Sequence, residues 1–163
     1  MIQHQLQAGA LAEGCADALV VAALFHDIGH VLGADDGDSA SAALAEERDA
    51  HHDVSGARWL SRWFGPDVTE PVRLHVAAKR YLVATEPAYA HNLSEASIHT
   101  LRLQGGAMSD VEARQFEGSR YALDAVALRR LDEAAKDPSR EVPGLGAYRD
   151  LVGRVLTSGI GMS

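Results

Sequence analysis

The sequence has few of the residues that would crosslink it, anchor it in a membrane or attract it to a polyanion. Cys15 is the only cysteine among 163 residues, which excludes an intrachain disulfide and fits a reducing compartment. No apolar run approaches the roughly 20 residues that span a bilayer. Acidic residues outnumber basic ones by 23 to 15, and the formal net charge is -8. We therefore predict a cytoplasmic protein that binds neither nucleic acid nor a membrane. The oligomeric state stays open.

Segments that predict β-strands are also missing. No stretch alternates apolar and polar residues for long enough to indicate a strand, whereas apolar residues recur at helical spacing along most of the chain. At 163 residues the chain has the length of one domain and can bury a single core. We predict an all-α fold, a compact helical bundle that forms one domain over residues 1–163. Helices are expected at residues 3–13, 17–32, 51–63, from 67, 95–103, 109–116, from 119 or 121, and 148–156.

Some individual positions follow from these helical patterns. Asp17 is expected to cap the helix that it begins, and Cys15 is expected to be a small core residue. Leu123 is expected to face the core. Residues 34–49 are acidic and rich in small side chains, so we expect a surface loop there, with room for a helical turn at residues 42–47.

The most informative stretch is an apolar run that ends in an adjacent histidine and aspartate, His26 and Asp27, with His30 one turn later. Burying an imidazole beside a carboxylate is costly unless a cation binds them, and a metal ion would satisfy both. The spacing of four residues brings His26 and His30 to one face of a helix, and the two oxygens of Asp27 could bridge two cations. A lone His-Asp pair is a weak indication, so further ligands must come from other helices.

Other helices do carry candidates. A single histidine on an apolar helix is more often a structural residue than a ligand, but several in one small domain favour a metal site. His52 is preferred to His51 because adjacent helical residues point about 100° apart and His52 shares a face with Trp59. His91 is expected to be an exposed surface residue. The candidate ligands are the histidines His4, His26, His30, His52 and His75 and the carboxylates Asp27 and Asp132.

Four imidazoles and two carboxylates are enough to hold two first-row transition metals. Imidazole with carboxylate suits iron, manganese or zinc better than calcium or magnesium, and the residues alone do not select among the first three. The order of these residues resembles that of the HD-domain metalloproteins, in which a His, a His-Asp pair, two further His and a late Asp bind metal. The matching residues here are His4, His26, Asp27, His52, His75 and Asp132.

Within that superfamily the chain is most similar to the mixed-valent diiron oxygenases of phosphonate catabolism (the PhnZ type), and more distantly to myo-inositol oxygenase. The resemblance implies two iron ions, Fe²⁺ and Fe³⁺, bridged by Asp27. One ion would be held by His4, His26 and Asp132, and the other by His52 and His75.

The resemblance also implies substrate-binding residues. His30 and Lys79 match groups with a catalytic role, and Ser97 and Gln104 look like the residues that hold the phosphonate. Lys136, four residues after the late Asp, completes the pattern of the branch. The family carries a helix before its first His, with a Tyr that gates one iron and a Glu that contacts the substrate amino group. Only three residues precede His4 here, so we expect that this helix is absent or truncated.

The expected activity is iron-dependent oxygenation. A small 1-hydroxyphosphonate, such as 2-amino-1-hydroxyethylphosphonate or a close analogue, would react with dioxygen to give phosphate and a carboxylic acid. The main alternative is a metal-dependent phosphohydrolase on the same scaffold, acting on a phosphate ester. The set of Lys79, Ser97 and Gln104 favours the oxygenase, because the hydrolase pattern does not require it. An inert metal-stabilised or ligand-sensing module is less favoured, because no effector domain is seen.

Overall fold

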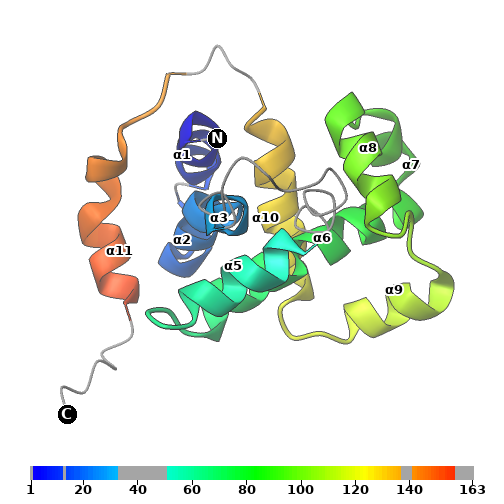
Figure 1. The fold of residues 1–163 in the computed structure, drawn as a ribbon, viewed down its shortest axis with the longest axis horizontal. Coiled ribbons are helices and arrows are strands. Elements are labelled where there is room, and N and C mark those ends of the chain that lie inside the picture. The colour runs from blue at the N-terminus through cyan, green and yellow to red at the C-terminus, as the bar shows by residue number, and fades with distance from the viewer. Residues whose placement is uncertain (1, 13, 33–50, 137–140, 157–163) are drawn as a thin grey trace, which may run out of the picture.

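The computed structural model describes residues 2–12, 14–32, 51–136 and 141–156, which fold into helices joined by short turns (Figure 1). Within those ranges the only β pairing is one isolated antiparallel bridge between Phe64 and Leu156, so the predicted all-α fold is confirmed. None of the helices described is both long and apolar enough to cross a membrane. The elements are α1 (Ile2–Leu11), α2 (Asp17–Phe25), α3 (Ile28–Leu32), α5 (His52–Leu60), α6 (Pro66–Thr85), α7 (Pro87–His91), α8 (Glu95–Leu103), α9 (Asp110–Glu117), α10 (Ala122–Ala134), the 3-10 helix η1 (Leu145–Tyr148) and α11 (Arg149–Val155).

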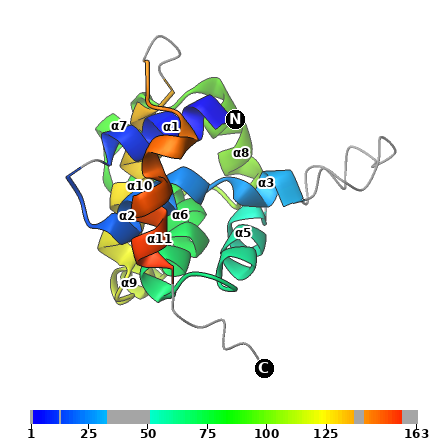
Figure 2. The same ribbon diagram turned by 90° about the vertical axis from the view of Figure 1, so that its left-hand side faces the viewer.

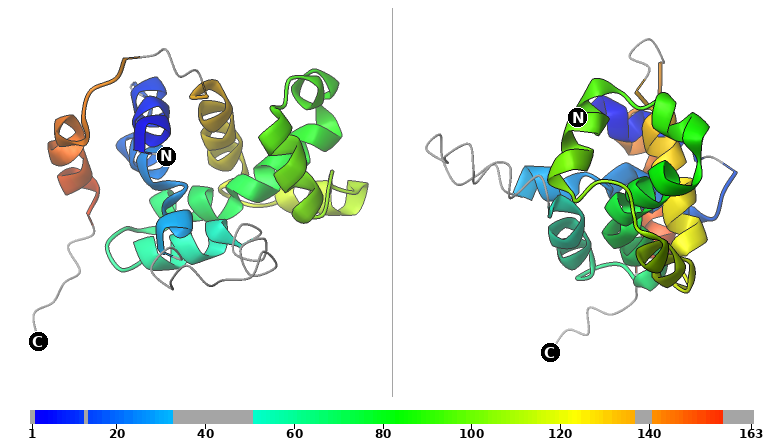
Figure 3. Two further views of the ribbon diagram at one scale, coloured as in Figure 1. Left: turned by 45° about the horizontal axis from the view of Figure 1, so that its top comes forward. Right: turned by 90° about the vertical axis from the view of Figure 1, so that its right-hand side faces the viewer.

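The long helix α6 is the element on which the others are arranged. It begins with Pro66, whose fixed φ suits the first helical position, and continues for 20 residues. Helices α2, α5 and α10 pack against it, and α1 lies beside both α2 and α10 (Figures 1 and 3). Helices α7, α8 and α9 gather at one end of the molecule (Figure 1), and α11 lies against α2 at the other end (Figure 2).

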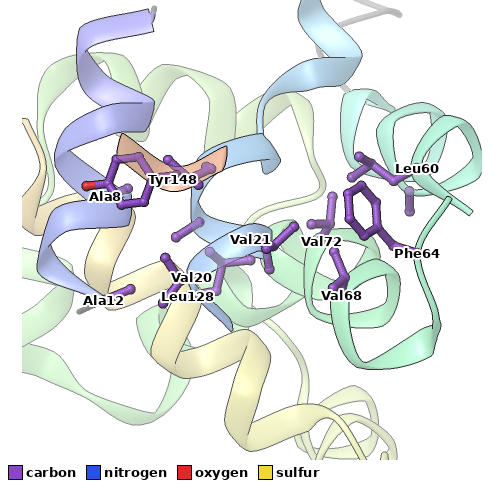
Figure 4. Close-up of a cluster of buried hydrophobic side chains, with 14 of the residues drawn as sticks. Ala8, Ala12, Val20, Val21, Leu60, Phe64, Val68, Val72, Leu128 and Tyr148 are labelled. Atoms are coloured by element: carbon purple, nitrogen blue, oxygen red, sulfur yellow. The ribbon is translucent and has the colours of Figure 1, made fainter. Parts of the chain in front are cut away.

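The main hydrophobic core lies where α1, α2, α5, α6 and α10 meet. Helix α2 is apolar all round, and Val20 to Leu24 are almost completely buried, as expected for a helix enclosed by its neighbours. Val72 and Leu128 pack beside it, and the ring of Tyr148 from η1 lies near Ala8 on α1 (Figure 4). The chain leaves this core directly at His26, so the packing of α2 fixes where the histidine stands.

One predicted helix is broken. Residues 17–32 do not form a single helix, because α2 ends at Phe25 and α3 begins at Ile28, with His26 and Asp27 in the turn between them. The physical reason is the close approach of α3 to α5. A Cβ atom added at Gly29 would lie 2.0 Å from the backbone oxygen of His52, a contact that only glycine permits.

Three single positions were also predicted wrongly. Ala16 is the N-cap residue of α2, and the Asp17 carboxylate instead accepts a hydrogen bond from Arg154 Nε at 2.9 Å. Cys15 is exposed because it lies in the turn that follows Gly14. Leu123 is 83% exposed, since the buried face of α10 begins one residue earlier, at Ala122, and recurs every three to four residues.

Two predictions about surface residues are confirmed, and one lies outside the structure. His51 and His91 are both exposed, as expected. The predicted loop at 34–49, with its helical turn at 42–47, lies outside the described residues.

Candidate metal centre

The six predicted metal ligands come together in two groups at the meeting point of the helices. In each group one ligand atom from every residue lies within 4.8 Å of the others. Helices α1 and α10 supply the outer members of the first group, and α5 and α6 supply the histidines of the second. The turn after α2 contributes to both. The first group is His4, His26 and Asp132, and the second is Asp27, His52 and His75.

The first group centres on one carboxylate oxygen. His4 Nε2 lies 2.7 Å from Asp132 Oδ1, and His26 Nε2 lies 3.5 Å from the same oxygen. His26 is completely buried and its Nδ1 lies 2.8 Å from the carbonyl oxygen of Ala23. Its Nε2 has no hydrogen-bond partner among the described residues. A histidine whose Nδ1–H is held by a backbone carbonyl offers Nε2 as a ligand atom, so this geometry fits a cation between His26 and Asp132.

The second group repeats this arrangement. His75 Nδ1 lies 2.6 Å from the carbonyl oxygen of Val72, and its Nε2 faces His52 Nε2 at 3.0 Å. Two imidazole nitrogens that face each other in a buried site repel unless a proton or a metal ion lies between them. His52 Nε2 is also 3.8 Å from Asp27 Oδ1, so the three side chains surround one position.

Asp27 connects the two groups. Its Oδ2 lies 3.4 Å from His26 Nε2, while its Oδ1 faces His52. The two oxygens of one carboxylate therefore point toward different groups, which is the arrangement a bridging ligand needs. His30 lies beside this bridge, with its ring stacked on His52 at a centroid distance of 3.9 Å and its Nε2 4.0 Å from Asp27 Oδ1.

Contacts within and around the two ligand groups set the charges of their side chains. Burial would raise the pKa of Asp132, but the adjacent Arg129 guanidinium, the nearby His26 imidazole and the hydrogen bond with His4 hold this pKa well below its usual range. Burial likewise opposes ionisation of Asp27, yet His26 holds its pKa well below the ordinary value. Burial alone would lower the pKa of His26, and the two carboxylates raise it well above the ordinary value instead. Both carboxylates are therefore charged at neutral pH and ready to bind a cation.

His75 is held neutral. Burial, followed by electrostatic repulsion from His52 and His26, lowers its pKa from 6.5 to about 3. A neutral imidazole is the form that binds a metal, so His75 needs no deprotonation before it can act as a ligand. The donor set of imidazoles and carboxylates suits a first-row transition metal.

A cavity of about 370 Å³ opens beside both groups and is lined by all the predicted substrate residues, His30, Lys79, Ser97 and Gln104. Lys79 is only 4% exposed and donates a hydrogen bond to Thr100 Oγ1 at 2.9 Å. Gln104 Oε1 is buried with no hydrogen-bond partner among the described residues. A buried ammonium and an unsatisfied amide beside two groups of candidate ligands are features of a binding site more than of a core.

Sequence reasoning missed Arg129. Its Nη1 contacts Asp132 Oδ2, its Nη2 donates to Ser97 Oγ at 3.3 Å and its Nε donates to Tyr89 Oη at 2.8 Å. Its spacing of three residues from Asp132 on one helix was a signal that could have indicated the contact. Tyr89, on α7, carries no such signal, because it is 40 residues away in the chain.

Comparison with known proteins identifies the family. A model of the HD domain matches residues 1–132. The chain belongs to the HD-domain family. Two similar proteins are named as phosphonate dioxygenases. The first, [1-hydroxy-2-(trimethylamino)ethyl]phosphonate dioxygenase (glycine-betaine-forming) from Leisingera caerulea, is 39% identical over 163 residues, which cover 99% of this chain and 81% of that protein.

The second is hydroxymethylphosphonate dioxygenase from Gimesia maris. It is 44% identical over 149 residues, which cover 90% of this chain and 73% of that protein. The predicted resemblance to HD-domain phosphonate oxygenases is thus confirmed, and so are the fold family and the assignment as an HD-domain oxygenase. Metal binding is supported by the family together with the two groups of ligands.

Proposed function

We propose that this HD-domain protein is a diiron oxygenase that cleaves the carbon–phosphorus bond of a small 1-hydroxyphosphonate. The first iron would be held by His4, His26 and Asp132, and the second by His52 and His75, with Asp27 between them. Two relatives named for hydroxyphosphonate substrates support the reaction class. The geometry of the two ligand groups supports the metal count.

The reaction balances with dioxygen as the only co-substrate. A 1-hydroxyphosphonate dianion and one dioxygen molecule give a carboxylate and dihydrogen phosphate. The C–H and C–P bonds break, and one C–O and one P–O bond form. The substrate loses four electrons in total, and these electrons reduce dioxygen. The hydrogens of the substrate C–H and O–H bonds both end on phosphate.

Bound iron would supply the redox chemistry of oxygen activation. The protein would bind and orient the substrate. Lys79 would hold a phosphonate oxygen with its buried ammonium, and Ser97, Thr100 and Gln104 would add neutral hydrogen bonds from the cavity wall. His30, whose ring lies on His52, would hold the proton of the substrate hydroxyl at the metal end of the cavity.

One observation supports this proposal most strongly. The buried side chain of Lys79 lines the same cavity as residues of both ligand groups. A dianion bound there would meet metal ions on one side and a charge-assisted donor on the other. In a protein of net charge -8, such local groups are needed to bind an anion at all.

Oxygen dependence tests the proposal. Protein loaded with ferrous iron should release phosphate from hydroxymethylphosphonate in air and should stop under anaerobic conditions. A simple phosphate monoester serves as the control substrate and should release nothing in either condition. Release that is equal with and without oxygen, or release from the ester, would instead establish the phosphohydrolase.

A further inference from the structure

Tyr89 on α7 is a polar residue close to the first ligand group. It belongs to neither ligand group and is not among the described residues that line the cavity. Its hydroxyl accepts a hydrogen bond from Arg129 Nε at 2.8 Å, and Arg129 in turn contacts Asp132. Resting on the iron centre of the proposed function, we infer that Tyr89 is a positioning residue. It acts through Arg129 to hold Asp132 in place as a ligand of the first ion.

The guanidinium of Arg129 is buried, and the residue is only 6% exposed. Its Nη1 contacts Asp132 Oδ2, and its Nη2 lies 2.5 Å from Glu133 Oε2. A buried cation is stable only where its N–H donors have partners, and a planar guanidinium presents these donors in fixed relative directions. The bond from Nε to Tyr89 therefore helps to set the directions of both Nη groups.

Contacts within α10 do not by themselves determine where this guanidinium lies. Asp132 and Glu133 follow Arg129 by three and four residues on the same helix, so Arg129 could pair with either carboxylate. Among the described residues, its partners on other helices are Ser97 on α8 and Tyr89 on α7. The bond to Ser97 Oγ is 3.3 Å long and the bond to Tyr89 Oη is 2.8 Å long. Tyr89 is thus the closer anchor from outside α10.

The place of Arg129 decides which oxygen Asp132 offers to a metal ion. Oδ2 contacts Arg129, whereas Oδ1 lies 2.7 Å from His4 Nε2 and 3.5 Å from His26 Nε2. Asp132 therefore turns a single oxygen toward the other two members of its ligand group. A partner that orients a ligating carboxylate raises metal affinity, because the ligand needs no rearrangement when the ion binds.

Tyr89→Phe tests the inference, because it removes the hydroxyl and keeps both the ring and the charge of Arg129. A substitution of Arg129 itself would also remove a positive charge beside the ligands. The iron-loaded full chain is dialysed anaerobically against increasing concentrations of a ferrous chelator, and the retained iron is counted. We expect Tyr89→Phe to weaken the binding of one of the two ions about tenfold. Retention of both ions as in the parent would overturn the inference.

Arg130→Gln is the matched control for the packing of α7 against α10. Arg130 Nη2 lies 2.6 Å from Oε1 of Glu86, the N-cap residue of α7, and both side chains are exposed. This pair joins the same two helices without including Arg129 or Asp132, and an exposed ion pair contributes little to stability. Arg130→Gln should retain both ions. An equal loss of iron from Arg130→Gln and Tyr89→Phe would assign the effect to helix packing and reject the positioning role.

A variant of the first ligand group identifies which ion is weakened. His4→Ala removes one ligand of that group and should release the first ion at low chelator concentration. If Tyr89 acts on the same group, adding Tyr89→Phe to His4→Ala should release no further iron, because the two effects are not additive. Further loss from the remaining ion would show that Tyr89→Phe weakens the protein in general, and would overturn the inference.

The two proposals fail in different ways. Parent-like iron retention in Tyr89→Phe, together with oxygen-dependent phosphate release by the parent, would reject the positioning role and keep the oxygenase. Selective loss of the first ion without oxygen-dependent release by the parent would keep the positioning role and reject the oxygenase. A parent that binds fewer than two iron ions would reject both.

Discussion

At the scale of single residues, Asp27 is the side chain on which both halves of the proposed metal centre depend. Its two oxygens face different ligand groups. Replacing Asp27 by Ala should empty both positions, so that iron content falls from about two per chain to well below one. Metal analysis of the purified variant measures this. Asp124→Ala, an exposed position on α10, should keep the parent's content. An unchanged content in the Asp27 variant would rule out a shared bridge.

Lys79 is the residue that should separate substrate binding from metal binding. Its buried ammonium is bonded to Thr100 and is not a member of either ligand group. Lys79→Ala should weaken phosphonate affinity roughly a hundredfold, because a charge-assisted hydrogen bond to a dianion is lost, while iron content stays intact. Calorimetric titration measures the affinity. Thr100→Val, which removes only the hydroxyl partner, should have a smaller effect. Parent-like affinity in the Lys79 variant would show that this residue does not hold the substrate.

The convergence of the proposed ligand residues could be predicted from the sequence, but their other neighbours could not. His26 and Asp27 are adjacent, and His52 and His75 lie on clearly periodic helices, so local patterns indicate that they face inward. The partnership of Tyr89 with Arg129 crosses 40 residues and leaves no periodic trace. Such contacts depend on how α7 sits against α10, which is a tertiary property.

At the scale of helices, the contact between α3 and α5 positions His52. Gly29 lies so close to the His52 carbonyl that any side chain must displace the backbone. Gly29→Ala should therefore destabilise the protein by about 1–3 kcal/mol and lower its iron retention, because α5 moves with its ligand. Thermal unfolding and metal analysis check both effects. Gly153→Ala lies in α11, where an added Cβ meets nothing within 4 Å and alanine favours the helix, so this variant should lower neither stability nor iron retention. A fully stable, fully loaded Gly29 variant would contradict this account.

The same contact explains the main error in the predicted helices. Apolar residues continue at helical spacing past His26 to Ile28, Val31 and Leu32, so the sequence pattern favours one helix over 17–32. The break is imposed by α5, which packs against α3 through Gly29 and Gly56. Periodicity within one segment carries no information about a neighbour such as His52, 23 residues after Gly29, which is why the turn that places Asp27 was not foreseen.

At the scale of the whole molecule, the buried histidines give the metal-free protein a stability maximum. The folded pKa of His75 is about 3, below the ordinary 6.5, so its contribution is lost as pH falls below about 6.5, at roughly 1.4 kcal/mol per pH unit. The folded pKa of His26 is raised, so its contribution is complete below the ordinary value and is lost as pH rises through the folded value. Unfolding of the chelator-treated protein should therefore show highest stability near pH 6.5.

Thermal midpoints from pH 3 to pH 9 measure this maximum. His91→Gln, at an exposed position, should leave its shape unchanged. Below about pH 4 the carboxylates of Asp27 and Asp132, whose folded pKa values are depressed, should add to the loss. A midpoint that rises steadily from acid to alkaline pH would contradict the charge states assigned to His26.

The hydrogen bond between His4 and Asp132 joins residues 128 positions apart in the chain. A ribosome adds about 5–20 residues per second, so His4 waits roughly 6 to 25 s for its partner to be synthesised. Asp27 and His52 are synthesised in the first half of that interval, and His75 is synthesised just after its midpoint. One half of the metal centre can therefore gather while translation continues, and the other half is completed only when α10 has been made.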